Sequence, residues 1–330
     1  MVTLLQAAGV PAVCAGKSKP SPAVWRAGQE RREETMILFI KQLINGVQIG
    51  GIYALVALGY TMVYGIIRLI NFAHGDFIMV GGYVAVFSIP VLLSAGLPAW
   101  LCILLAVLAC MVIGVTTEKI AYKPLRNAAS LSALITAIAV SLFLQNVALL
   151  LFGSSPRPVS GIFNAGPVTI GSVQISGIAL ITIVVSVIIM IGLQLFIKGT
   201  RMGKAMRAVS EDKQAAILMG INTNRTISIT FAIGSGLAAM AAVMYCSAYP
   251  QVQPYMGSML GLKAFIAAVL GGIGSIPGAM IGGIVLGIIE SLSKAYISSQ
   301  LSDAIVFAVL IVVLLVRPTG LFGKKLNEKV

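Results

Sequence analysis

The stretch RLINFAHGDF, residues 68–77, holds the side chains of this sequence that are best suited to chemistry. His74, the only histidine, stands there with Asn71 and Asp76. A histidine near a carboxylate can transfer protons or orient a serine nucleophile. However, the chain has no nucleophile elbow, and one histidine without a suitable pair of cysteines supplies too few metal ligands. These residues therefore argue against an enzyme, and they predict no metal site and no cofactor.

A second stretch, GTRMGK at residues 199–204, is similar to a phosphate-binding loop. It is one residue short between its glycines, and Ala205 stands where a serine or threonine should follow the lysine. We reject it as a nucleotide site. Any nucleotide that drives this protein must then be bound by another chain.

Composition shows which elements surround these residues. Hydrophobic residues make up 58% of the chain and charged residues 10%, whereas a soluble domain carries about 25% charged residues. Several apolar runs approach the roughly 20 residues that a helix needs to cross a bilayer. The sequence therefore predicts an all-α integral membrane protein. The net charge of +13 is explained by basic residues that flank the spans on the cytoplasmic side, and we expect no nucleic-acid partner.

About eight or nine transmembrane helices are expected. Glycines and a proline (Gly271, Gly272, Gly274 and Pro277) interrupt the apolar pattern after the seventh, so a broken or re-entrant segment is predicted near 257–279. The pairs Gly46/Gly50, Gly278/Gly282 and Gly283/Gly287 have the small-xxx-small spacing that lets helices approach closely in lipid. The helices are expected near 46–67, 77–94, 98–117, 131–152, 177–198, 226–248, 257–271, 276–293 and 302–317.

Few charged residues lie within these spans. Lys263 and Glu290 each lie near the end of one, so we expect Glu290 to have an interfacial role rather than to bind an ion. This scarcity argues against transport that is driven by a coupled ion. Three of the four cysteines lie in apolar runs, as buried free thiols do.

The loops between the spans set the orientation. Residues 118–126 carry three basic residues, residues 198–225 carry six, and the C-terminal tail is also basic. Placing these loops in the cytoplasm follows the positive-inside rule. It requires the 257–271 segment to cross the membrane.

The N-terminal 35 residues differ from the rest, because they are rich in proline, glycine and charge. We expect residues 1–35 to be a non-native or disordered extension, with Met36 as the native start. A genuine tail that begins at Met1 is the alternative. Residues 36–330 should then form one transmembrane domain with a cytoplasmic loop at 198–225.

That cytoplasmic loop is expected to dock on a partner. Between Arg201 and Ile221 it alternates charged and apolar residues at helical spacing, and its methionines, Met202, Met206 and Met219, are expected to be exposed. Gly220 is placed like the residue that ends a helix in a left-handed conformation. Glu211 and Asp212 could accept hydrogen bonds from a partner, whereas a membrane surface would not favour them.

Three long motifs, at residues 50–76, 201–222 and 263–283, resemble those of the LivH-type permease subunits of bacterial ABC importers for branched-chain amino acids. The resemblance covers almost the whole chain except residues 1–35. It implies a multi-pass permease in the bacterial inner membrane, a second homologous permease subunit, two ABC ATPase subunits and a periplasmic substrate-binding protein.

The resemblance also implies roles for particular residues. The 201–221 segment would be the element that couples to the ATPase, through Arg201, Gly203, Arg207, Glu211, Asp212 and Gly220. Asn71, His74 and Asp76 have two interpretations. They either satisfy the ends of two helices, with Asp76 capping a helix that begins near Phe77, or they line the translocation path or its gate.

Alternating access driven by ATP, with Leu, Ile and Val as substrates, is the mechanism that the resemblance implies. Two other functions stay open at this point. An ABC permease for urea or short amides would share the architecture. An ion-coupled secondary transporter would need no nucleotide.

Overall fold

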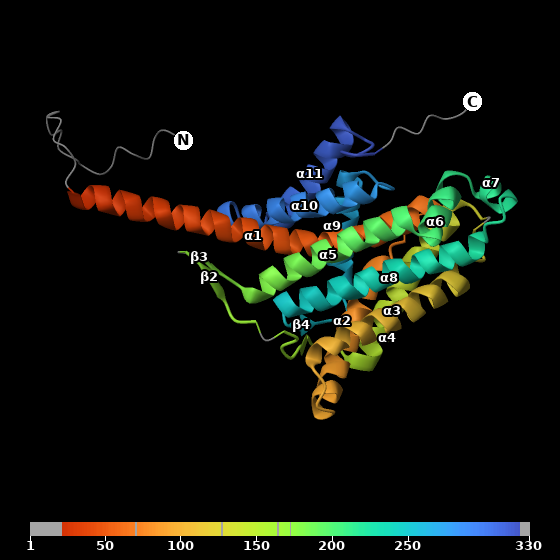
Figure 1. Ribbon diagram of the computed structural model, residues 1–330, viewed down its shortest axis with the longest axis horizontal. Helices are drawn as coiled ribbons and strands as arrows, with labels where there is room; N and C mark the ends of the chain where they lie inside the picture. The colour runs from red at the N-terminus through yellow and green to blue at the C-terminus, as the bar shows by residue number, and fades with distance from the viewer. Residues whose placement is uncertain (1–21, 70, 127, 164, 172, 324–330) are drawn as a thin grey trace. The chain divides into compact units, whose positions relative to one another are not determined.

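The computed structural model describes residues 22–69, 71–126, 128–163, 165–171 and 173–323. Within this part the chain is almost entirely helical (Figure 1). Four short strands, β1 (Arg157–Pro158), β2 (Val168–Ile170), β3 (Val173–Ile175) and β4 (Gln251–Val252), form two antiparallel pairs, β1 with β4 and β2 with β3. The helices are α1 (Pro22–Ile67), α2 (His74–Ser94), α3 (Cys102–Thr117), α4 (Ser130–Phe152), α5 (Gly177–Gly199), α6 (Arg201–Glu211), α7 (Lys213–Leu218), α8 (Thr223–Ala248), α9 (Met256–Gly271), α10 (Ile276–Tyr296) and α11 (Ser302–Val316).

The prediction of an all-α membrane protein is confirmed. Seven of the described helices are long and apolar enough to cross a membrane, and α9 and α11 are apolar but shorter. Each of the nine predicted ranges corresponds to one of these helices. The third range continues further than expected, because a π-helical turn, Glu118–Tyr122, extends α3.

The first helix begins earlier than predicted. Residues 22–35, which were expected to belong to the N-terminal extension, are the first part of α1. Residues 1–21, where the remainder of that extension and Cys14 fall, lie outside the described residues. Among the described residues, those up to Phe39 and those from Ile40 onward belong to two separate units.

Close helix crossings occur at the predicted glycine pairs. Gly283 and Gly287 of α10 lie against the backbone of α1, so that a Cβ added at Gly287 would be 2.3 Å from the Gly50 nitrogen. On another face of α10, a Cβ at Gly282 would be 2.2 Å from the Ala267 oxygen of α9. Dispersion contacts between backbones can drive association where lipid offers no hydrophobic gain. Helices α1, α10 and α9 therefore pack as a layer through glycines.

The start of α2 lies deep among the other helices. His74, its first residue, packs between Gly59 of α1 and Gly234 of α8. Gly234 is eleven residues into α8, or about 16 Å at 1.5 Å per residue. The stretch around His74 was expected to connect two spans at a membrane surface. Instead, α2 begins near the middle of the helices that surround it.

The strands β1 and β4 and the helices α6 and α7 lie at opposite ends of the second unit. The β1–β4 pair joins the 153–176 loop to the linker before α9, whereas α6 and α7 lie at the other end of α5 and α8 (Figure 1). Helix α9 begins beside β4, and Gly274, just beyond its end, lies beside Arg207 of α6. Helix α9 thus extends from the end that carries β4 to the end that carries α6, and the predicted break is present at residues 272–275, between α9 and α10.

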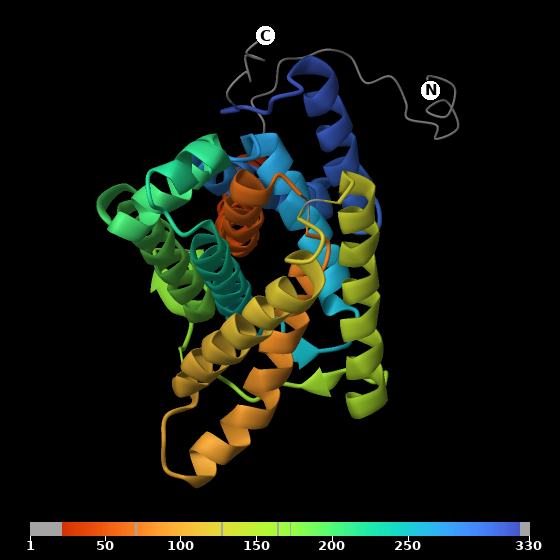
Figure 2. The same ribbon diagram turned by 90° about the vertical axis from the view of Figure 1, so that its right-hand side faces the viewer.

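Burial distinguishes central from peripheral helices. In the most apolar stretch of α8, 78% of the residues are buried, against 17% in α4. Figure 2 shows α4 at the side of the bundle, with α1 enclosed among other helices. The outward face of α4 is apolar and exposed, with Leu131, Leu142 and Leu150 among its residues, so that face is available to lipid or to another subunit.

Candidate functional site

The predicted coupling segment forms two short helices at one end of the bundle. Helix α6 begins at Arg201, which is exposed, and Thr200 caps it by accepting a hydrogen bond from the Gly203 amide at 3.0 Å. Gly203 is buried, and a Cβ there would be only 2.4 Å from the Ile197 backbone, so a larger residue would not fit in this turn. The tight turn between α5 and α6 thus fixes α6 rigidly to the end of a membrane span.

Helix α7 is capped at both ends by residues that the sequence had singled out. The Asp212 carboxylate accepts hydrogen bonds from the amides of Gln214 and Ala215, at 2.8 and 3.0 Å. At the other end Gly220 adopts φ +80°, as predicted, and closes the helix with a bond from its amide to the Ile217 carbonyl. Asp212 therefore holds the shape of the segment, whereas Glu211 is exposed.

The expectation of exposed methionines in this segment is confirmed for Met219 and wrong for Met206. Met206 and Val209 are 4% and 2% exposed, because α6 packs them onto the bundle. Instead, Leu218 and Met219 at the tip of α7 are 88% and 81% exposed, and Ile217 is 53% exposed. Helical spacing alone could not tell which of the two apolar groups faces inward. The surface formed by Ile217, Leu218 and Met219 is called the α7 tip below.

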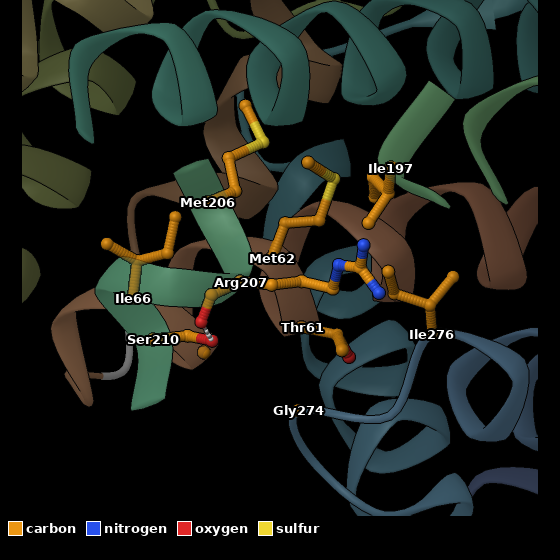
Figure 3. A pocket seen from close by; sticks show the side chains of 10 residues that line it. Thr61, Met62, Ile66, Ile197, Met206, Arg207, Ser210, Gly274 and Ile276 are labelled. Carbon is orange, nitrogen blue, oxygen red and sulfur yellow. Dashed lines mark hydrogen bonds between the residues drawn. The ribbon is translucent and has the colours of Figure 1, made fainter. Parts of the chain in front are cut away.

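Arg207 connects α6 to three other helices. It lines a small cavity of about 80 Å³ with Thr61 and Met62 of α1, Ile197 of α5 and Ile276 of α10. Figure 3 shows the arginine side chain lying between α6 and the start of α10. Arg207 therefore lies beside the same cavity as the end of α1 and the start of α10.

The helix break lies beside this cavity. Gly271 ends α9, and Gly272 and Gly274 have φ angles of +102° and +91°, which disfavour other residues. Pro277 follows in the first turn of α10, whose cap is Ser275. The chain after α11 returns to the break, where the amides of Leu321 and Phe322 donate to the carbonyls of Leu270 and Gly271 at 2.9 and 3.0 Å. All four predicted break residues thus lie together where α9 ends and α10 begins.

The second predicted group, Asn71, His74 and Asp76, is buried. Tyr122, at the end of the π-helical turn, donates to the Asn71 side-chain oxygen at 2.5 Å. The Gln145 amide of α4 donates to Asp76 at 2.9 Å and to Ser258 of α9 at 3.0 Å. The group therefore ties the start of α2 to α3, α4 and α9.

Two details of this group differ from the sequence-based interpretation. Asp76 does not cap α2, because the helix begins at His74 after Ala73, and no side chain caps it. The His74 ring instead packs edge-on against Tyr60, with centroids 4.7 Å apart. Among the described residues, the side-chain nitrogen of Asn71, Nε2 of His74 and Oδ2 of Asp76 have no hydrogen-bond partner. The three residues thus keep unused polar atoms within the bundle.

Two ion-pair clusters were not foreseen. Glu118 is buried, pairs with Arg126 and accepts from Ser228 at 2.6 Å, so it fastens the end of α3 to α8. Glu290 is 1% exposed and accepts from Lys263 at 2.8 Å, from Lys294 at 2.6 Å and from Tyr53 at 2.7 Å. Glu290 is therefore enclosed by neighbouring helices, six residues before the end of α10. The i,i+4 spacing of Glu290 and Lys294 was the only signal in the sequence.

Comparison with known proteins gives a consistent result. Residues 42–314 match the family model of the branched-chain amino acid transport system permease component. Over 215 residues the chain is 45% identical to the high-affinity branched-chain amino acid transport system permease protein BraD of Pseudomonas aeruginosa, which covers 62% of this chain and 70% of that protein. It is 47% identical over 221 residues to the LivH permease protein of Escherichia coli K12, covering 64% and 71%.

A likeness to a solved structure is weaker. A chain of PsaBC from Streptococcus pneumoniae in complex with Fab covers 83% of this chain and 90% of its own length, with 16% identity and a TM-score of 0.42. That similarity is too low to carry an argument.

Proposed function

Because this chain belongs to the family of branched-chain amino acid transport permease components, we propose that it is the membrane-spanning subunit of an ATP-driven importer for leucine, isoleucine and valine. The permease does no chemistry itself. Two ABC ATPase subunits supply the energy, a second homologous permease completes the path, and a periplasmic binding protein delivers the substrate. The complex lies in the bacterial inner membrane.

The basic loops orient the subunit. Lys119, Lys123 and Arg126 lie at the same end of the bundle as α6 and α7, since Arg126 contacts Asn224 at the start of α8. Basic residues are retained on the cytoplasmic side. This distribution supports a cytoplasmic position for the coupling segment, where ATPases bind, with the β1–β4 pair on the periplasmic side.

The main support for a coupling role is the exposure of the α7 tip. Leu218 and Met219 are 88% and 81% exposed at the end of a helix that is capped on both sides. Burying such a side chain contributes about 1.5–3 kcal/mol, so a rigid apolar tip favours insertion into a groove of a partner. Glu211, which is exposed at the end of α6, can accept hydrogen bonds from that partner.

Coupling then passes from α7 to the helices that form the path. Closure of the ATPases on ATP moves the α7 tip, and α6 moves with it because the α6–α7 junction has no flexible linker. Arg207 transmits this movement to α1 and α10, next to the glycine break. The break at 272–275 is where α9 and α10 can change their mutual angle, which suits alternating access.

A direct test is co-purification of the ATPase subunits with permease variants. We expect Leu218→Asp to lower the bound ATPase about 10-fold or more, because it removes roughly 1.5–3 kcal/mol of burial and adds a buried charge. Leu321→Asp, a matched change at the same end of the bundle but away from the α7 tip, should leave binding near that of the unaltered chain. Equal binding by both variants would contradict the assignment of the α7 tip.

A further inference from the structure

A second cavity, of about 240 Å³, opens among α1, α8, α9 and α10 on the side of the bundle opposite the coupling segment. It is smaller than the roughly 300–1,000 Å³ of pockets that hold drug-sized ligands, so it suits a small solute. The charged cluster of Lys263, Glu290 and Lys294 lines it. We propose that this cavity is a transient binding site for the zwitterionic amino acid on its way through the permease. The inference rests on the proposed function.

The depth of the cluster fits a site on the path. Glu290 is fourteen residues into α10, which places it about 21 Å from the cytoplasmic end of that helix. Tyr53 is likewise fourteen residues from the end of α1. Charged residues at this depth are costly in a membrane and mark substrate or ion pathways when they face the protein interior. The opposite end of α10 is six residues, or about 9 Å, from Glu290, so the cluster lies in the half of the bundle from which a delivered substrate would enter.

With Asp303, which pairs with Lys263 outside the cavity lining, the charges of the cluster balance. Lys263 pairs with Glu290 at 2.8 Å and with Asp303 at 2.7 Å, and Lys294 pairs with Glu290 at 2.6 Å. Two lysines thus face two carboxylates. A zwitterion carries one charge of each sign, so it can insert into such a cluster without leaving a net charge buried. A net anion or cation would leave one charge unpaired, which costs several kcal/mol in a low-dielectric site.

The side chains of Lys263 and Lys294 differ in exposure, and this difference suggests a different role for each in binding the substrate. The side chain of Lys263 is 9% exposed and bonded to two carboxylates, so it anchors the cluster. The side chain of Lys294 is 40% exposed, and its recorded ion pair is with Glu290 one helical turn away. Lys294 can therefore turn its ammonium group to the carboxylate of an incoming amino acid while Lys263 and Tyr53 keep Glu290 satisfied.

The other residues that line the cavity can contact the ammonium group and the aliphatic side chain of the substrate. Tyr245, Tyr249 and Tyr255 line the cavity, and aromatic faces and hydroxyl groups attract an ammonium group. Met256, Met259 and Leu260 supply an apolar wall. Methionine side chains adapt to different shapes, which suits aliphatic side chains that branch at different carbons. The cavity thus offers a contact for each of the three groups of leucine, isoleucine and valine.

The test uses the assembled importer in proteoliposomes and a leucine analogue that carries a diazirine in its side chain. After illumination, we expect this probe to label peptides from the end of α8 and the start of α9, at residues 245–263. Excess leucine should compete for labelling, whereas 4-methylpentanoate, which lacks the ammonium group, should not. Labelling confined to other segments, or equal competition by both compounds, would overturn the proposal.

Substitution of Lys294 provides the second measurement. Lys294→Gln should lower both labelling and leucine uptake per assembled complex about 10-fold, because it removes a charged hydrogen bond to the carboxylate. Lys294→Arg should restore most of both, and Lys119→Gln, which removes an exposed lysine outside the cavity, should change neither. Full labelling and uptake by Lys294→Gln would refute the site. Failure of the unaltered complex to import leucine would instead refute the proposed function.

Discussion

The close crossing of α1 and α10 predicts how much stability the chain should lose when Gly287 is replaced by alanine. Gly287→Ala would place a Cβ 2.3 Å from the Gly50 nitrogen and 2.4 Å from the Gly46 oxygen. Carbon atoms prefer about 3.5 Å, so the two helices must separate by about 1 Å. Overpacking of this kind costs about 1–3 kcal/mol, and both partners are backbone atoms that cannot rotate away.

A matched substitution in α5 controls for helix propensity. Gly192 is exposed, and a Cβ there would have no neighbour within 4 Å. Replacing glycine by alanine inside a helix gains about 0.8–1 kcal/mol, so Gly192→Ala should stabilise the chain. Because both variants gain this helix propensity, they should differ by the overpacking cost alone, roughly 1–3 kcal/mol. Thermal unfolding of each in the same detergent, followed by loss of helical circular dichroism, measures the difference. A midpoint for Gly287→Ala at or above that of Gly192→Ala would refute the crossing.

Three further predictions concern the end of the bundle that carries the coupling segment. Asp212→Ala should cost about 0.5–2 kcal/mol of α7 stability and lower ATPase co-purification severalfold, whereas Asp212→Asn keeps a capping oxygen and should bind almost normally; equal loss in both would show that charge, not capping, matters. Gly220→Ala forces a residue with a side chain to φ +80° and should cost about 1 kcal/mol, which a fall in ATP-driven uptake would report. Glu118→Gln leaves Arg126 buried without its counter-charge and should cost about 3–5 kcal/mol, seen as a large loss of folded protein; the double change Glu118→Leu with Arg126→Met should recover much of the yield.

Helix positions could be predicted because the membrane imposes one dominant pattern. A span needs about 20 apolar residues, and charged loops separate one span from the next. Glycine spacing likewise identified residues that make close crossings, although it could not name the partner. That Gly287 meets α1 while Gly282 meets α9 depends on which helices are neighbours, and sequence spacing does not contain that information.

Side-chain partners between helices were the part that could not be predicted. Lys263 and Glu290 come from adjacent helices but meet only because α9 and α10 pack as an antiparallel pair, and Tyr53 joins them from the far end of the sequence. The depth of His74 was missed for a related reason. A short polar stretch between two spans normally lies at the surface, and nothing in its composition shows that α2 begins inside the bundle. The segment of α1 before residue 36 was missed because charge and proline suggest a loop, although proline is compatible with a first helical turn.

The central claim is that this subunit moves branched-chain amino acids only when ATPases drive it through the coupling segment. The most direct test is uptake of radiolabelled leucine by proteoliposomes that contain the permease pair, with and without the ATPase subunits, the binding protein and ATP. We expect uptake above background only with the complete set, and loss of that uptake with the Leu218→Asp permease. Leucine accumulation by the permease alone, or uptake that persists without ATP, would contradict the claim.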